Sequence, residues 1–275
     1  MDNRAIGIFD SGLGGLTAVA ALRELMPREN IVYFADSARV PYGAKSREEL
    51  LIMARQDLEL MASFSAKFII AACGTVSSNA SQVIESFPIP SLGVLKPGIQ
   101  AMSRIPGSAP LGIIATAASI KAGAFRRELE KLCPGREIVD LPCPDFVPLI
   151  ESGHTGSDDP ELRAAVERSL APAKAAGIAA LLLGCTHYGI IAPAIQGFLG
   201  DGVELVSASE SAAQAACRRL SQLALTGDSS GETLYYTSGN TEEFSAAASR
   251  LLGREIHALH VPVMKISKEY GDKSK

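Results

Sequence analysis

The chain has 275 residues, of which 47% are hydrophobic and 20% charged, and its net charge is -4. This composition is typical of a globular protein with one large domain or two ordinary ones. The small negative charge excludes an extended basic surface for nucleic acid or a membrane. No apolar run approaches the roughly 18 residues of a membrane span, and residues 1–5 lack a signal peptide's apolar core, so we expect a cytoplasmic protein.

Short apolar runs alternate with longer amphipathic stretches along the chain. This alternation predicts an α/β fold with mostly parallel sheets flanked by helices, and a site at the carboxyl ends of the strands. The expected strands are residues 5–9, 31–35, 68–72, 111–115, 138–141, 179–183, 205–206 and 233–237. The clearest expected helices are residues 16–26, 47–63, 160–176 and 209–226.

A weak internal repeat divides the chain. A strand beginning near Gly7 ends in a small polar loop, and a later strand ends at Cys73; Gly112 and Cys185 repeat the arrangement. Chance similarity between α/β units is the plain alternative. A true repeat predicts two similar domains that each present one cysteine to a shared cleft. The expected domains are residues 1–97 with 209–275, and residues 98–208.

The five cysteines include no Cys-x-x-Cys motif, so free thiols are expected in a reducing compartment. Cys73 ends an apolar strand, and Thr75, Ser77 or Ser78 is expected to cap a helix behind it. A helix amino terminus stabilises a thiolate, although a buried cysteine also packs as a small hydrophobe. Three others, which are expected to pack or to be incidental outside such loops, are Cys133, Cys143 and Cys217.

Cys185 also ends an apolar strand, and His187 follows two residues later. A histidine at this distance can exchange a proton with a thiol or hold a thiolate. The pair could instead begin a zinc site with Cys73 as third ligand, but zinc needs three or four protein ligands. Glu151 is expected either as a solvated acid or as a partner of His187.

A glycine-rich turn after the first strand contains Asp10, Ser11, Gly12 and Gly14. It invites comparison with a dinucleotide-binding turn, and Asp36 at the end of the next strand fits the ribose-binding acid. The fingerprint fails because Thr17 occupies the third glycine position, and Asp10 would repel a pyrophosphate. The glycines favour close approach to a small ligand, or a plain tight turn.

Two weaker motifs complete the set: Pro41-Tyr42-Gly43, a rigid turn with an aromatic ring, and a polar loop at Thr116. Together the five motifs, in this order and spacing, resemble those of the glutamate racemases within the aspartate/glutamate racemase superfamily. The resemblance extends from Ile6 to about Val261. It implies two α/β domains with the active site between them, and catalysis by two cysteines without pyridoxal phosphate or metal.

Residue by residue, the resemblance implies that Cys73 and Cys185 are acid and base on opposite faces of glutamate. It implies that Asp10 and His187 assist them and that Glu151 lies behind the histidine. The implied substrate-binding residues are Asp10, Ser11, Tyr42, Gly43, Gly74, Thr75, Thr116, Thr186 and His187. The resemblance further implies a homodimer that supplies D-glutamate for peptidoglycan.

Four positions depart from the family pattern: Gly74 stands where asparagine is usual, Gly189 where proline is, Phe125 where tyrosine is and Ser119 where threonine is. The loss of a side chain at position 74 leaves only a backbone amide for the substrate. Aspartate is therefore the first alternative substrate.

The chemistry suits two thiols, because racemisation removes a proton from one face of Cα and delivers one to the other. A thiol with a pKa of about 8.5 can serve as acid or base near neutral pH. Three other classes compete: a cysteine hydrolase using one Cys–His pair, a nucleotide-binding module, and a pyridoxal-dependent racemase with Lys96 as the Schiff-base lysine.

Overall fold

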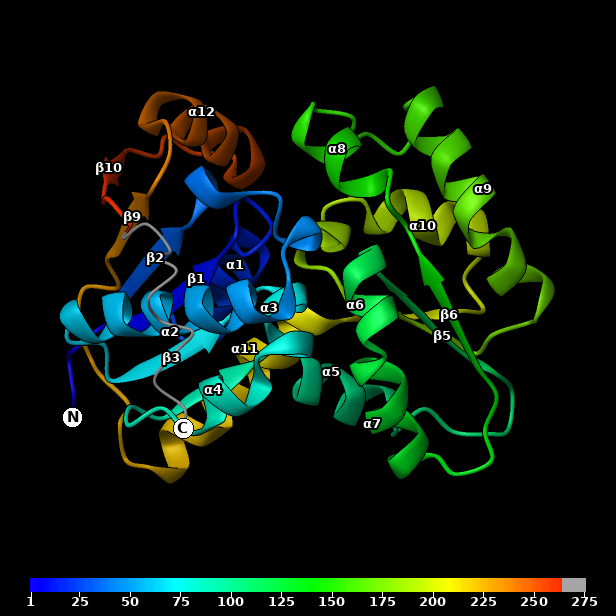
Figure 1. Cartoon of the computed structure of the whole chain (residues 1–275), viewed down its shortest axis with the longest axis horizontal. Coiled ribbons are helices and arrows are strands. Elements are labelled where there is room, and N and C mark those ends of the chain that lie inside the picture. The colour runs from blue at the N-terminus through cyan, green and yellow to red at the C-terminus, as the bar shows by residue number, and fades with distance from the viewer. Residues whose placement is uncertain (264–275) are drawn as a thin grey trace.

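Two parallel sheets, each flanked by helices, form the two halves of the molecule in a computed structural model that describes residues 1–263 (Figure 1). The first sheet has the strand order β10-β9-β2-β1-β3-β4 and the second β6-β5-β7-β8. The strands are β1 (Ile6–Asp10), β2 (Ile31–Ala35), β3 (Phe68–Ala71), β4 (Ser91–Gly93), β5 (Leu111–Ala115), β6 (Ile138–Pro142), β7 (Ala180–Leu183), β8 (Glu204–Ser207), β9 (Thr233–Thr237) and β10 (Ala258–His260). The predicted α/β class is confirmed.

Helices connect successive strands, as parallel pairing requires. They are α1 (Leu16–Leu25), α2 (Arg47–Ser63), α3 (Gly74–Asn79), α4 (Ser81–Glu85), α5 (Leu95–Met102), α6 (Ala117–Ala122), α7 (Ala124–Leu132), α8 (Phe146–Glu151), α9 (Pro160–Ala175), α10 (Ala192–Leu199), α11 (Ala208–Gln222) and α12 (Thr241–Leu252). Short 3-10 turns are η1 (Ser37–Arg39), η2 (Tyr42–Ala44) and η3 (Thr186–Gly189).

The halves repeat one strand order. β1 lies between β2 and β3 with β4 outside, and β5 lies between β6 and β7 with β8 outside. Gly7 pairs with Ile69 in the first half, and Gly112 pairs with Leu181 in the second. The repeat therefore places the loop after β3 and the loop after β7 at equivalent positions. β9 and β10 extend the first sheet alone.

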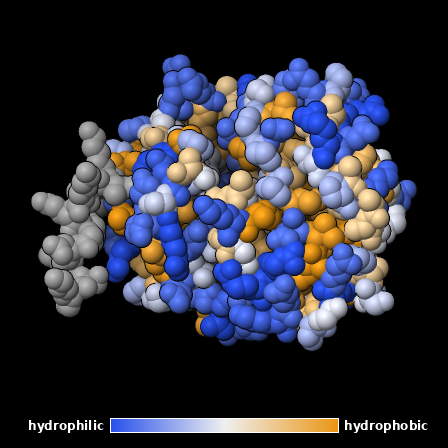
Figure 2. All heavy atoms as spheres, turned by 45° about the vertical axis from the view of Figure 1, so that its right-hand side comes forward, coloured by the Kyte–Doolittle hydropathy of each residue, from blue (hydrophilic) through white to orange (hydrophobic). Residues whose placement is uncertain are grey.

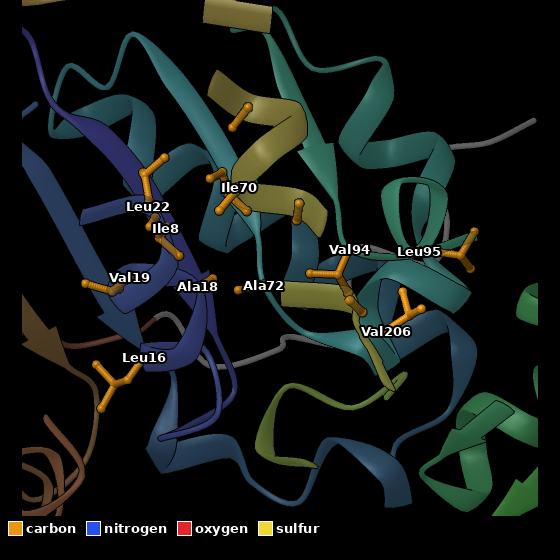
Figure 3. Packing of buried hydrophobic residues seen from close by; sticks show 14 of the residues in the cluster. Ile8, Leu16, Ala18, Val19, Leu22, Ile70, Ala72, Val94, Leu95 and Val206 are labelled. Atoms are coloured by element: carbon orange, nitrogen blue, oxygen red, sulfur yellow. The ribbon is translucent and has the colours of Figure 1, made fainter. Parts of the chain in front are cut away.

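One hydrophobic cluster joins the halves. It contains Ile8 and Ile70 from the first sheet and Leu182 and Val206 from the second. Figure 3 shows Val206 close to Val94, which precedes α5, and α1 packed over the β1 and β3 side chains. Because interiors pack densely and resist deformation, this cluster holds the two sheets in a defined relation.

The predicted helix over residues 209–226 is wrong at its end, since α11 stops at Gln222. Ala224 takes a left-handed φ of 55°, and the amide of Leu225 donates back to the carbonyl of Leu220 at 2.9 Å. The apolar spacing continued past Gln222 because Leu225 packs against the core from a turn. The predicted strands and the other three helices agree with the structure to within one residue at each end.

The outer surface is mixed in character. The face turned forward in Figure 2 is mainly hydrophilic, with smaller hydrophobic groups between the charged and polar residues. Within residues 1–263, every helix is too short or too polar to cross a bilayer.

Candidate active site

A cavity of about 470 Å³ lies where the carboxyl ends of the two sheets face one another. All twelve residues singled out from the sequence line it, from both halves of the chain. They are Asp10, Ser11, Tyr42, Gly43, Cys73, Gly74, Thr75, Thr116, Glu151, Cys185, Thr186 and His187. The expected juxtaposition of two thiols in one cleft is therefore present.

Cys73 enters the cavity at the junction of β3 and α3. Cys73 itself occupies the N-cap position of α3, so the expectation that Thr75, Ser77 or Ser78 caps the helix is wrong. These three residues lie inside α3, where Ser78 Oγ instead donates to the Gly74 carbonyl at 2.8 Å. Cys73 Sγ lies 3.8 Å from Ser11 Oγ.

Burial is the main cause that raises the pKa of Cys73 well above its ordinary value. The side chain is only 4% exposed, and the negative charge of Asp10 raises the pKa further. The Val76 amide and the Ser11 hydroxyl act in the opposite direction, because hydrogen bonds to sulfur stabilise the thiolate. The raised pKa thus favours the thiol form of Cys73.

Asp10 is a fully buried carboxylate that joins the two halves. The amides of Ser11 and Gly15 donate to it from its own loop, and Thr186 Oγ1 donates to it from the opposite half at 3.1 Å. Burial raises the pKa of Asp10, while the positive charge of His187 and these amides lower it. The carboxylate is therefore hydrogen-bonded to loops of both halves.

Cys185 has a different partner. Its Sγ lies 3.8 Å from His187 Nδ1, and His187 Nε2 lies 3.2 Å from Glu151 Oε1. Burial by itself would lower the pKa of His187, but the hydrogen bonds to Cys185 and Glu151 and the charge of Asp10 raise it to about 10. A protonated His187 can donate a hydrogen bond to the sulfur of Cys185 and a second one to Glu151. The structure thus selects the partner role for Glu151 that the sequence left open.

The glycine-rich turn is supported by contacts that the sequence did not reveal. Tyr33 Oη donates to the carbonyl of Gly12 at 2.5 Å. Thr17 Oγ1 bonds to the carbonyl of Thr186 at 3.2 Å and to Ser209 Oγ at 2.9 Å, which ties α1 to the second thiol loop. Nothing in the local sequence identifies these partners, because they lie far apart along the chain.

Tyr42 is held from behind by buried acids. Its hydroxyl donates to Asp36 and, at 3.2 Å, to Asp57, while Arg39 bonds to both carboxylates. Burial and the charge of Asp36 raise the pKa of Asp57 well above its ordinary value. Asp36 therefore anchors the Pro41-Tyr42-Gly43 turn, which argues against the ribose-binding role of the dinucleotide alternative.

Cys143 corrects the expectation that it lies outside such loops. It follows β6 directly, is buried, and lines the same cavity as the two paired thiols. Burial raises its pKa to about 12. The signal was present in the sequence, since the predicted strand over residues 138–141 ends two residues before it. Its high pKa and the absence of a basic partner among its described contacts favour packing over proton transfer.

Hydrogen bonds between hydroxyl groups join α3 to α6 and to the residue that precedes it. Thr75 Oγ1 lies 3.2 Å from Thr116 Oγ1, and Ser78 Oγ donates to Ser119 Oγ at 3.2 Å. Thr116 also caps α6 by accepting from the Ser119 amide. These bonds cross between the halves in the middle of Figure 1, where α3 and α6 face each other.

The competing site chemistries find less support. Within residues 1–263, no group of three or more His, Cys, Asp or Glu side chains is arranged to hold a metal ion. Lys96 pairs with Glu85 at 2.7 Å and lines a separate cavity of about 520 Å³. The part of that cavity's lining that the structure describes contains neither cysteine nor histidine, although the cavity is the larger of the two.

Comparison with known proteins identifies the family of this chain. The Asp/Glu/Hydantoin racemase family matches residues 17–216. Glutamate racemase from Desulforudis audaxviator is 36% identical over 264 residues, covering 93% of this chain and 96% of the relative. The chain therefore belongs to the Asp/Glu/Hydantoin racemase family.

Solved structures extend this agreement to three dimensions. The crystal structure of glutamate racemase from Francisella tularensis in complex with D-glutamate has a TM-score of 0.86 and 33% identity, covering 96% of this chain and 98% of that one. The glutamate racemase from Thermus thermophilus in complex with β-chloro-D-alanine also has a TM-score of 0.86, with 36% identity and coverage of 95% and 98%.

Proposed function

We propose that this protein interconverts L- and D-glutamate by a two-thiol mechanism that needs no cofactor. The observation that carries the proposal is the pair of thiols, Cys73 and Cys185, at the ends of topologically equivalent strands of two halves that enclose one cavity. Relatives named glutamate racemase, similar over nearly the whole chain, support glutamate as the substrate.

In the proposed reaction one thiolate removes the α-proton and the opposite thiol delivers a proton to the other face of Cα. The bond from carbon to hydrogen breaks on the first face and a new one forms on the second. The two cysteines exchange roles when the direction reverses. Because both thiols are buried, electrostatic contacts to the carbanion-like transition state are stronger beside them than in water.

The partners are proposed to assist one thiol each. Asp10 lies next to Cys73 through Ser11, and His187 lies next to Cys185 with Glu151 behind it. His187, with its raised pKa, is proposed to carry a proton beside Cys185, whereas Cys73 starts as the thiol.

The remaining lining residues are proposed to hold the substrate. Hydroxyls of Ser11, Thr75, Thr116 and Thr186 and backbone amides at Tyr42, Gly43 and Gly74 supply donors for two carboxylates. Asp10 and His187 are close enough to the thiols to contact the substrate's ammonium and carboxylate groups. Such positioning accounts for much of the rate gain in an enzyme that uses only side-chain proton transfer.

We further propose, from the family resemblance, that the protein is a cytoplasmic homodimer that supplies D-glutamate for peptidoglycan. The domain division at 97/98 and 208/209 is also a proposal; the strand order supports it, while the shared hydrophobic cluster crosses it.

Circular dichroism of L-glutamate, and separately of L-aspartate, incubated with the purified protein tests the function. Decay of the glutamate signal to zero without added cofactor is the expected result. Decay of the aspartate signal alone would identify aspartate as the substrate and leave the proposed mechanism unchanged. No decay with either would overturn the racemase proposal, and turnover of thioester or amide substrates would then favour the cysteine hydrolase.

A further inference from the structure

Gly74 follows Cys73 directly and packs against the opposite thiol loop. A Cβ built on Gly74 would overlap the carbonyl oxygen of Gly184, and it would also meet the Cα of Cys185 at 3.6 Å. The loop that carries the first thiol therefore touches the loop that carries the second thiol at a point where any side chain would be excluded.

The backbone conformation does not explain this glycine. The φ of Gly74 lies outside the left-handed region, and the residue is the first in α3. Alanine is a better helix former than glycine and would be favoured there by local structure alone. Only the close approach of the second half requires the absence of a side chain.

The opposing carbonyl has little freedom to move away. The amide of Gly184 donates to the carbonyl of Ile114 at 2.8 Å, and a Cβ on Gly184 itself would lie 2.9 Å from that same oxygen. On the other side, the amide of Ala72 donates to the Phe9 carbonyl at 2.8 Å, which ties the first thiol loop to β1. A side chain at position 74 must therefore separate the two halves.

A second glycine makes a similar approach. A Cβ on Gly14 would overlap His187 Nδ1 and Thr186 Oγ1, and the φ of Gly14 is likewise outside the left-handed region. Two glycines of the first half thus approach the same loop of the second half, the one that carries Cys185.

We propose that Gly74 determines how far the cleft closes, and so sets the separation of the two thiols and the length of substrate that fits between them. The effect on turnover rests on the proposed racemase function; the effect on closure does not. A displacement of about 1 Å in a catalytic group can cost about 100-fold in rate, so a single methyl group at position 74 is expected to have a large effect.

The test compares Gly74→Ala with Gly197→Ala, whose Cβ would meet nothing within 4 Å in α10. Two readouts are measured: kcat and KM for glutamate and the longer 2-aminoadipate, and the rate at which iodoacetamide alkylates Cys73 and Cys185, followed by mass spectrometry of the peptides. For Gly74→Ala we expect kcat for glutamate to fall about 10- to 100-fold, the preference to shift toward 2-aminoadipate, and both thiols to be alkylated faster. Gly197→Ala should match the wild type.

Unchanged alkylation together with kcat within threefold of the wild type would overturn the proposal. So would an increase in activity for Gly74→Asn, which introduces the residue that is usual in the family. If the wild type racemises no glutamate, the proposed function fails, while the alkylation rates still decide whether Gly74 controls closure. Should Gly74→Ala fold poorly, Gly14→Ala tests closure at the second contact through the alkylation rate of Cys73 alone, because its Cβ would also displace His187 and so lower kcat directly. An unchanged Cys73 alkylation rate in that variant would overturn the proposal.

Discussion

The two halves share a strand order but surround their thiols with opposite charges. Cys73 lies beside the buried carboxylate Asp10, whereas Cys185 lies beside His187, whose pKa is raised to about 10 by hydrogen bonds to Cys185 and Glu151 against the opposing effect of burial. The shared part consists of apolar strands, which pack alike in both halves; the divergent part consists of the loops that follow them. The difference teaches that a repeated scaffold can position two identical groups and still give them different electrostatic partners.

The amino ends of the same strands differ as well. Before β3, Lys67 is fully buried and pairs with Glu29 at 2.5 Å. At the equivalent end of the second sheet, Ala179 precedes β7, and the half-buried Arg136 donates to the carbonyls of Ile105, Pro106 and Ala109. At this end of the sheets, the first half contains a buried ion pair, whereas the second half contains an arginine that donates hydrogen bonds to backbone carbonyls.

The largest expected effect comes from removing either thiol. Cys73→Ser and Cys185→Ser should each lower steady-state racemisation by about 10²- to 10⁴-fold, the usual contribution of a positioned acid or base. Each variant should still exchange the α-proton of one enantiomer with deuterated solvent, and the two variants should retain opposite enantiomers. Full racemase activity in either variant would exclude the two-base mechanism. Cys217→Ser, which changes a thiol outside the cavity, is the matched control.

The next effect concerns the ends of the sheets. Lys67→Met leaves Glu29 buried without its partner and should lower the free energy of unfolding by about 3–5 kcal/mol. Arg136→Met removes charged hydrogen bonds at a more exposed place and should cost about 1–3 kcal/mol. Urea unfolding measures both. If the double variant Lys67→Met with Glu29→Gln regains most of the free energy of unfolding lost in Lys67→Met, the unpaired charge of Glu29 is the cause. Equal losses in Lys67→Met and Arg136→Met would contradict the comparison.

A smaller effect should distinguish the two thiol partners. Asp10→Asn and His187→Asn each disturb proton transfer at one cysteine and should slow turnover by about 10- to 100-fold. The slowed proton transfer becomes rate-limiting, so deuterium at Cα should slow racemisation more than it does in the wild type. This primary isotope effect should rise for one enantiomer with Asp10→Asn and for the other enantiomer with His187→Asn. A rise for the same enantiomer in both variants would show that Asp10, through its bond to Thr186, serves the second thiol instead.

The smallest effect is expected at Glu151, whose side chain is 43% exposed and therefore partly screened by solvent. Glu151→Gln removes one cause that raises the pKa of His187, so this pKa should fall from about 10. A raised pKa stabilises the fold below the ordinary value of 6.5, and that stabilisation is lost as the pH rises through about 10. The urea concentration at the unfolding midpoint falls as the pH rises from 6 to 10.5, and in Glu151→Gln this fall should begin at a lower pH than in the wild type. Superimposable profiles would argue against the Glu151–His187 coupling.

Much of the fold was predictable because buried parallel strands are continuous apolar runs. β4 and β10 escaped prediction, since each has three residues and their burial depends on neighbouring strands. α3 was predicted to begin later because Thr75, Ser77 and Ser78 are frequent capping residues. In the structure their hydroxyls bond within the helix or to α6 instead, which only tertiary packing decides.

The site was predictable where its residues share a local motif with the thiols. Cys185 and His187 are two residues apart, so their spacing alone paired them, whereas Asp10 was joined to the thiols by the family resemblance. Thr17, Tyr33 and Ser209 escaped because their contacts join distant segments. Gly74 looked like a simple loss of a side chain, and its contact with Gly184 became visible only when both halves were placed.

The unequal partners of the two thiols also have a thermodynamic consequence. L- and D-glutamate have the same free energy in water, so an enzyme that interconverts them must have the same kcat/KM in both directions. The carboxylate beside Cys73 and the imidazolium beside Cys185 therefore cannot favour one direction overall. They can only distribute the barrier differently, so that the enantiomer that binds more tightly is turned over proportionally more slowly.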